Sequence, residues 1–585
     1  MDTRLFYGRK EQDQNVGQIP SDSEDSEIDS DSEEEWNREQ DTQDTRGDED
    51  EDEDVDDSLF EEDSRSSKTP RWKTCHTTAA PVHPDWLHTP PSADEILTPY
   101  QYFKNLLSDD LFELIVKESN LYSIQCNPNK PLNLTIEELE QFFGTVLHMS
   151  LFGLPATRMY WSQSSRIPHV ADMMPLARWE AIKKFLHFSD NSGQPTKDMA
   201  DYDELYKIRP LLDHILAKLK QLPMHENLSV DEQMVPFKGK SRIKQYLPSK
   251  PRKWGYKILV LAGSDGVPHN FEVYTGKAVH PTELPDVGAS GNVVLRLAEI
   301  VPKNRNFKLF FDNWFSSVPL MIVLSQQGIH CVGTVRSNRL PGSSMMSDAD
   351  LKRSGRGSFQ EKTAYVGDTQ LHAVKWYDNR SVTTLSTYVG AHPVSSVDRW
   401  DRRQKQTIKV TCPAAVSTYN QHMGGIDLLD SLIALYRTNI RSKKWYHRLV
   451  FHLIDLVVVT CWLIYRRDCA DNGMVRSEHM HLYAFKSQIA HSLCKFKKVA
   501  RKRGRTSGGI SQQYEEKRRR QGPTAPIPNQ DVRLDNTSHW QIMCEKKGRC
   551  RVPGCTGTPK VMCKKCNVRL CFTAEKNCFL KFHTE

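Results

Sequence analysis

The spacing of apolar and polar positions divides the chain into regions of different periodicity. Apolar residues recur at helical spacing over residues 97–222 and again over 425–493. Between these regions, short apolar runs of strand length alternate with a helical stretch at 293–301. Alternating strands and helices are typical of a mixed sheet with helices on its faces. The pattern therefore predicts an α/β fold flanked by helical segments.

A change of pattern separates residues 336–413 from this α/β region. Short β runs at 358–366, 371–377 and 382–389 are joined by turns, and helical spacing is absent there. We interpret the stretch as a β insertion within the α/β domain. The predicted segments are a disordered acidic region at 1–95, helical regions at 96–226 and 440–494, an α/β core at 227–335 and 414–439, the β insertion at 336–413, a basic linker at 495–535 and a cysteine-rich segment at 536–585.

Four aspartates, at three places in the chain, stand where the apolar pattern changes. The apolar run at 307–311 predicts a buried strand that ends at Asp312, and Asp231 follows a similar run. A carboxylate at the end of a strand lies at the rim of the sheet, where open sheets bind ligands. Asp427 and Asp430 begin an apolar helix and share one of its faces. Alternatively, acids at strand ends are solvated, and Asp427 stabilises a helix N-terminus.

The net charge of +5 conceals a strong asymmetry. Residues 21–63 hold 24 acids and two bases, so the remainder of the chain carries +27. A basic body behind an acidic region favours a nucleic-acid partner, although the acidic region could serve only to keep the chain soluble. Basic clusters at 497–503 and 517–520 are typical of nuclear localisation signals or phosphate contacts, and otherwise of a solvated linker. We expect a nuclear location.

No segment indicates secretion or a membrane. The first four residues, Met1 to Arg4, lack the apolar stretch of a signal peptide. The most apolar run, at 456–464, is too short to span a bilayer and predicts a buried helix.

Basic and aromatic side chains alternate between residues 238 and 257. Lysine and arginine contact phosphates, and aromatic rings stack on unpaired bases, so this composition suits a DNA groove. Trp314 could support a distorted DNA strand in the same way, or it could be ordinary core packing. The candidate DNA-binding residues are Lys250, Lys253, Trp254, Arg336, Lys443 and Lys444.

Seven of the fourteen cysteines fall between residues 544 and 578. Such clustering favours metal over disulfides, and the spacing of Cys563 and Cys566 is that of a zinc knuckle. Seven candidate ligands exceed one tetrahedral zinc, and two zinc ions need eight, which leaves His539 or Cys544 as the eighth ligand. The seven candidates are Cys550, Cys555, Cys563, Cys566, Cys571, Cys578 and His583.

Several motifs occur in the order of the piggyBac transposase family, which the chain resembles over nearly everything after residue 97. They are VDEQMVPFKGK (230–240), YLPSKP (246–251), DNWFSS (312–317), GTVRSNR (333–339) and MGGID (423–427). The resemblance implies an α/β RNase H-like catalytic core interrupted by the β insertion. It also implies a flanking all-α dimerisation and DNA-binding region, and a C-terminal zinc-binding domain that contacts transposon ends.

The resemblance also implies a function for the acids. Asp231, Asp312 and Asp427 match the family's catalytic triad, which holds two Mg²⁺ ions, and Asp430 matches an additional acid. The expected activity is cut-and-paste transposition at TTAA targets through hairpin ends, by a homodimer on double-stranded DNA. His539 is the expected eighth ligand of two zinc ions. The chain departs from the family between Cys550 and Cys555, where four residues replace the common two.

In a second interpretation the chain is a member of the same family but does not catalyse transposition. The chain would then be a host-retained, transposase-derived nuclear protein that binds DNA through its zinc module and moves nothing.

Overall fold

The structure is a computed structural model that describes residues 70–75, 83–91, 93, 95–196, 198–199, 201–248, 253–276, 280–402, 404–495, 527–528 and 530–585. These residues belong to one compact unit, Lys68–Glu585. The acidic stretch at 21–63, Lys250 and both basic clusters of the predicted linker lie outside the described residues.

A ten-stranded sheet carries the fold, in the order β1-β8-β9-β10-β7-β6-β2-β4-β3 with β5 paired to β4. β2 is parallel to β6, and β6 is parallel to β7, whereas the other neighbours are antiparallel. The predicted mixed sheet is therefore confirmed. The strands are β1 Lys73–Thr74, β2 Asn227–Pro236, β3 Gln245–Tyr246, β4 Trp254–Gly263, β5 Pro268–Val273, β6 Phe307–Phe311, β7 Ile329–Thr334, β8 Phe359–Val366, β9 Thr369–Tyr377 and β10 Ser381–Ser386.

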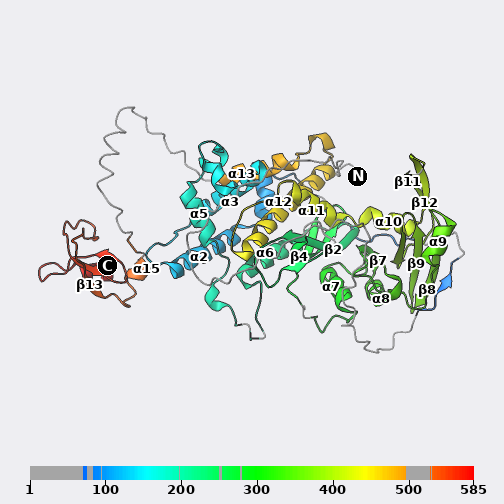
Figure 1. Cartoon of the computed structure of the whole chain (residues 1–585), viewed down its shortest axis with the longest axis horizontal. Coiled ribbons are helices and arrows are strands. Elements are labelled where there is room, and N and C mark those ends of the chain that lie inside the picture. The colour runs from blue at the N-terminus through cyan, green and yellow to red at the C-terminus, as the bar shows by residue number, and fades with distance from the viewer. Residues whose placement is uncertain are drawn as a thin grey trace, which may run out of the picture. The chain divides into compact units, whose positions relative to one another are not determined.

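Both faces of the sheet's centre are buried. On β4, Ile258 and Val260 pack into one core, and Leu259 and Leu261 pack into another. Alternate side chains of a strand point to opposite faces, so this continuously apolar strand separates two cores. The first core includes α11 (Gly425–Leu435) and α12 (Trp445–Asp471), and the second includes α7 (Ala289–Ala298) and α8 (Val318–Gln326) (Figure 1).

The two helical regions, separated in sequence, pack into one core with α12 at its centre. Thr135 caps α3 by accepting a hydrogen bond from the Glu138 N–H at 3.3 Å, as a threonine before an acidic first turn favours. The remaining helices of this core are α1 Pro99–Leu106, α2 Asp109–Cys126, α3 Ile136–Phe152, α4 Pro168–Ala171, α5 Leu176–Phe185, α6 Arg209–Leu219 and α13 Leu482–Lys495.

The predicted β insertion contains β8, β9 and β10, which extend the central sheet because β10 pairs with β7. It also contains α9 (Asp348–Ser354) and a separate two-stranded ribbon of β11 (Ser395–Asp401) and β12 (Gln406–Cys412). This ribbon was not among the predicted strands. β12 carries apolar residues at 408, 410 and 412, which is the alternation of a half-buried strand, whereas β11 has no such alternation and most residues of the ribbon are exposed or half-buried.

Part of the region predicted as disordered is ordered against the sheet. Lys73 pairs with Thr363 of β8, and the Trp86 ring packs edge-on against Phe307 with centroids 5.7 Å apart. The prediction of disorder up to residue 95 is therefore wrong for 70–75 and 83–91. The composition of residues 1–95 is dominated by the acidic stretch, and it hides the two tryptophans that supply apolar surface, Trp72 and Trp86.

The apolar run at 456–464 lies in the middle of α12, a helix of 27 residues. By length and composition alone this helix could cross a bilayer, but 94% of its most apolar window is buried inside the protein. Core helices of globular proteins share this property, so the predicted buried helix is confirmed.

A buried ion pair holds α12 to α13 and to the chain that leaves α11. Asp455 accepts hydrogen bonds from the Thr438 N–H at 2.7 Å, the Thr438 hydroxyl at 2.9 Å and the Lys486 ammonium at 2.8 Å. Lys486 also donates to the Tyr436 carbonyl at 2.7 Å. Both charged side chains are almost completely buried.

We expect Lys486→Met to lower the free energy of unfolding by about 3–5 kcal/mol, because it leaves the Asp455 carboxylate buried without its counter-charge. Urea unfolding followed by circular dichroism measures the change. Lys495→Met, at an exposed position of the same helix, is the control. A loss below about 1 kcal/mol would mean that the pair contributes no more than a surface ion pair.

Stability should also depend on pH through His269 of β5. Burial lowers the pKa of this histidine from 6.5 to about 3, and Arg467 and His225 add to the shift. The unfolded chain therefore binds a proton that the folded chain excludes, so this contribution is complete above pH 6.5 and is lost as the pH falls towards 3.

Removing the ring nitrogens in His269→Phe should make the decline between pH 6 and 4 shallower by about 1.4 kcal/mol per pH unit. Unfolding curves at pH 7, 6, 5 and 4 measure this slope. His481→Phe, at an exposed site, should leave it unchanged. Parallel pH profiles for wild type and His269→Phe would contradict the assignment.

Candidate active site and metal centres

The register of two parallel strands brings Asp231 and Asp312 side by side. Val230 of β2 pairs with Phe311 of β6, so the two aspartates are the next residues on adjacent strands. Such strands lie about 4.8 Å apart. Asp312 directly follows β6, as predicted. Asp231 lies in the middle of β2 rather than at a strand end, because β2 continues along β4 to Pro236 after its pairing with β6 has stopped.

The side chain of Asp231 faces α11 and α12. Val230 packs in the core of α7 and α8, and its neighbour Asp231 points to the opposite face. Ser229 and Gln233 share that face. Gln233 bonds to side chains of α11 and α12, which fixes the orientation of the strand.

Asp312 faces the same layer of helices through α10 (Ala414–His422). Phe311 packs with α7 and α8, whereas Phe310 packs with Ala415 and Tyr419 of α10. The alternation places Asp312 on the side of Phe310. The two aspartates therefore lie under the segment that joins α10 to α11.

A glycine brings Asp427 to this place. Gly425 lies so close to the sheet that a Cβ there would be 2.2 Å from the Gly263 carbonyl oxygen and 3.0 Å from the Ser229 hydroxyl. Only glycine permits this approach. α11 consequently begins against β2, and Asp427, two residues later, is exposed.

The Tyr419 hydroxyl lies within reach of the charges of all three carboxylates. Burial raises the pKa of its hydroxyl, and the charges of Asp312, Asp231 and Asp427 raise it further, against a hydrogen bond with Thr334 that lowers it. The hydroxyl thus stays protonated and remains a hydrogen-bond donor. Tyr419 was not predicted as a site residue, although Tyr419 and Asn420 belong with the MGGID motif to the segments that carry the resemblance.

Two sets of hydrogen bonds fix the loop that follows Asp312. One carboxylate oxygen of Asp312 accepts from the Trp314 N–H at 2.7 Å. The Arg339 guanidinium donates to the carbonyls of Asn313, Trp314 and Ser316 at 3.0, 2.7 and 3.2 Å. Arg339 therefore holds the loop that carries Asp312, a role that the GTVRSNR motif alone did not reveal. Trp314 is half-buried against the α7–α8 core.

The donor set suits a hard cation, because it consists of carboxylate oxygens, the ligands that Mg²⁺ prefers. Within the described ranges, the acids do not form a group with all ligand atoms within 4.8 Å of one another, as the cysteines and histidines do. A pair of ions about 3.5–4 Å apart needs a wider ligand set than a single tetrahedral ion. The carboxylates are therefore of the ligand type that Mg²⁺ takes.

The predicted DNA contacts fall into two groups. Lys253, Trp254, Arg336 and Lys443 are exposed. Lys444 is half-buried, with its ammonium hydrogen-bonded to the Lys184 carbonyl and 5.0 Å from the Tyr122 ring centre; burial lowers its pKa to about 8. Lys444 is thus engaged within the protein.

An exposed aromatic pair stands beside these lysines. Trp254 and Tyr246 are 48% and 46% exposed, and their ring centres are 4.8 Å apart on the paired strands β3 and β4. The Lys244 ammonium lies 4.6 Å from the Trp254 ring centre. Paired exposed rings next to a cation are typical of a platform for nucleic-acid bases.

The C-terminal segment contains two groups of ligand atoms that could each hold a metal ion. One is His539, Cys563, Cys566 and His583, and the other is Cys550, Cys555, Cys571 and Cys578. The two groups interleave along the sequence, so each ion would join distant parts of the segment. Cys544 belongs to neither group, and His539 occupies the eighth position. The larger gap between Cys550 and Cys555 does not prevent them from meeting.

Both histidines of the first group are held for ligation. Nδ1 of His539 lies 3.5 Å from Cys563 Sγ and 3.4 Å from Cys566 Sγ, and its Nε2 donates to Asp535 at 2.9 Å. Nδ1 of His583 donates to the Phe579 carbonyl at 2.7 Å, which leaves Nε2 for a metal. Metal-binding histidines usually bond their second nitrogen to a carboxylate or carbonyl in this way.

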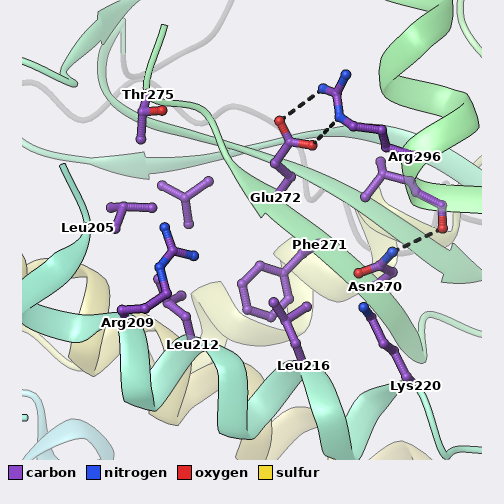
Figure 2. A pocket seen from close by; sticks show the side chains of 12 residues that line it. Leu205, Arg209, Leu212, Leu216, Lys220, Asn270, Phe271, Glu272, Thr275 and Arg296 are labelled. Carbon is purple, nitrogen blue, oxygen red and sulfur yellow. Dashed lines mark hydrogen bonds and ion pairs between the residues drawn. The ribbon is translucent and has the colours of Figure 1, made fainter. Parts of the chain in front are cut away.

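A cavity of about 300 Å³ lies elsewhere, between α6, β5 and α7 (Figure 2). Arg296 and Glu272 form a two-bond ion pair on its wall, with both N–O distances 3.0 Å, and Arg209 is paired with Asp203. None of the candidate acids lines it. The cavity is therefore separate from the carboxylate site.

Two known human proteins resemble the chain over most of its length. The human PiggyBac transposable element-derived protein 3 is 29% identical over 521 residues, which cover 88% of this chain and 81% of that protein. The human PiggyBac transposable element-derived protein 2 is 29% identical over 483 residues, which cover 80% and 76%.

A solved structure and a family assignment complete the comparison. A cryo-EM structure of the piggyBac transposase synaptic complex with hairpin DNA has a TM-score of 0.58 and 20% identity, and covers 83% of this chain and 99% of that one. At this identity the likeness concerns the fold. The transposase IS4 family matches residues 98–462, well over half of the chain. The chain belongs to this family and is similar to human proteins named as derived from piggyBac transposable elements.

Proposed function

We propose that the chain is a Mg²⁺-dependent DNA transposase in which Asp231, Asp312 and Asp427 are the metal ligands and Asp430 supports them. The observation that carries the proposal is the convergence of three carboxylates, from β2, the end of β6 and the start of α11, around the Tyr419 hydroxyl. The strand order β5-β4-β2-β6-β7, with three antiparallel strands followed by two parallel ones, supports an RNase H-like core.

Two Mg²⁺ ions held there would stabilise the attacking and leaving oxygens of an in-line phosphoryl transfer. The chain's own residues would arrange the rest. Arg339 and the Trp314 N–H keep the Asp312 carboxylate in one orientation. The protonated Tyr419 hydroxyl offers a donor beside the carboxylates. Such preorganised groups contribute because they need not rearrange during the reaction.

The substrate in this proposal is double-stranded DNA with transposon ends and a TTAA target, processed through hairpin ends by a homodimer in the nucleus. The cryo-EM relative, a synaptic complex with hairpin DNA, supports the DNA and the hairpin. The cysteine-rich segment would hold two structural zinc ions and bind the transposon end. Cysteine–histidine sets in tetrahedral number support zinc as the metal.

The Trp254–Tyr246 platform gives the proposal a binding test. We expect Trp254→Ala to weaken affinity for hairpin or single-stranded end DNA by about 1–3 kcal/mol, because a stacked base loses its partner. Fluorescence anisotropy at a fixed salt concentration measures it. Tyr365→Ala removes a still more exposed ring from β8 and is the control. Equal affinities for Trp254→Ala and wild type would show that the Trp254–Tyr246 platform does not contact the DNA.

A second candidate function is nuclear DNA binding without transposition. The observation that favours it is that both human relatives are named as derived from a transposable element. Incubating the full chain with Mg²⁺ and labelled duplex from the DNA flanking its gene separates the two. Nicks or hairpins support the transposase, and zinc-dependent binding without cleavage supports the second candidate.

A further inference from the structure

Three side chains from three separate elements form a hydrogen-bonded chain that ends at Asp430. Gln233 of β2, two residues after Asp231, donates from Nε2 to the Asp430 carboxylate at 2.6 Å. Its Oε1 lies 2.7 Å from Nε2 of His452 on α12. Gln233 and His452 are buried, whereas Asp430 is only partly buried. The chain therefore runs from the interior to the carboxylate site.

The chemistry of the three groups fixes the direction of every bond. An ionised Asp430 can only accept, so it must face the amide NH₂ of Gln233 rather than the amide oxygen. The amide oxygen then faces His452, whose Nε2 must donate. An amide rotated by half a turn would set oxygen against carboxylate, and in a buried network such an unpaired arrangement is strongly unfavourable. His452 thus selects the orientation in which Gln233 serves Asp430.

The position of Gln233 links the two carboxylate-bearing elements directly. It shares a strand face with Asp231, and it bonds to the helix that carries Asp427 one turn before Asp430. A rotation of α11 about its axis would move Asp427 and Asp430 together. The hydrogen bond from Gln233 opposes that rotation in the N-terminal half of α11, which lies over the sheet.

We infer that Gln233 is a positioning residue, which holds Asp430 and the start of α11 against β2, and that His452 acts through Gln233 by setting the direction of its amide. The inference rests on the proposed function, because it gives Asp430 a supporting role at a metal site. Positioning partners of metal sites typically change metal affinity by about 10–100-fold.

Calorimetric titration of the zinc-loaded full chain with Mn²⁺ tests the inference, with Asp312→Ala defining the binding that belongs to the acidic site. We expect Gln233→Met, which keeps the volume and removes both polar atoms, to weaken that binding at least about tenfold. His452→Phe should do the same, and His452→Gln, which keeps an N–H donor, should stay within about threefold. Gln326→Glu, an exposed control on α8, should match wild type.

A double-mutant cycle separates this role from general destabilisation. If Gln233 acts through Asp430, then Gln233→Met should change Mn²⁺ affinity less than twofold in an Asp430→Asn background. Equal losses in both backgrounds, or wild-type affinity in Gln233→Met, would overturn the inference and leave the proposed function standing. If Gln233→Met fails to fold, the Mn²⁺ affinities of His452→Phe and His452→Gln test the inference instead. Equal Mn²⁺ affinities for these two variants would overturn the inference. Absence of any Asp312-dependent Mn²⁺ binding in wild type would overturn both.

Discussion

A chain with Asp312→Ala is expected to lose metal-dependent cleavage of transposon-end DNA by about a thousandfold or more and to retain its affinity for that DNA. Asp312 follows β6 directly, and Arg339 donates hydrogen bonds to three carbonyls of its loop. The substitution removes the proposed metal ligand and the Trp314 N–H bond to it, while β6 and the bonds to these carbonyls remain. The proposed phosphate contacts are other residues. Gel analysis of labelled nicks and hairpins, with anisotropy of the same duplex, measures both quantities.

A matched control for this substitution is Asp368→Ala, an exposed aspartate in the turn between β8 and β9 of the same sheet. It should cleave at the wild-type rate. Residual cleavage by Asp312→Ala within tenfold of wild type would exclude Asp312 as a metal ligand. Loss of DNA affinity together with cleavage would instead indicate that the loop is part of the DNA surface.

The local sequence pattern was sufficient to predict elements whose formation depends on their own residues alone. The run at 307–311 has the length and composition of a buried strand, and all five residues are buried. Likewise the start of α11 was visible as two acids before an apolar stretch. Neither prediction required knowledge of a neighbour. Asp312 and Asp427 were therefore identifiable as candidates from the residues alone, although their meeting was known only through the resemblance.

The remainder depends on contacts between distant segments. Asp231 lies inside β2 because β4 extends the strand to Pro236, and no property of residues 227–236 sets that length. The approach of Gly425 to Gly263 and the bond from His452 to Gln233 join residues far apart in the sequence. A glycine and a glutamine carry no periodic signal, so pattern analysis cannot distinguish them from ordinary ones.

In the cysteine-rich segment, too, part of the site was predicted from the sequence and part depended on the fold. Spacing identified seven ligands and left the eighth open, because ligand choice depends on which atoms converge. The structure places His539, and not Cys544, beside Cys563 and Cys566. Metal ions bound by these groups would stabilise a small segment with a short apolar core, since their binding free energy would become folding free energy.

Cys563→Ser is accordingly expected to remove about one of two zinc ions per chain and to unfold the cysteine-rich segment, because structural zinc supplies about 10–16 kcal/mol in small zinc modules. Zinc content by atomic absorption and the rate of proteolysis within residues 530–585 measure the loss. Cys544→Ser, a cysteine of the same segment outside both ligand groups, should keep two zinc ions and wild-type protection. Equal zinc loss from both variants would assign Cys544 to a ligand set, whereas full zinc in Cys563→Ser would exclude the set centred on His539. The two ligand groups interleave along the sequence, so each ion would join distant parts of the segment. Loss of either ion should therefore expose the whole segment to protease.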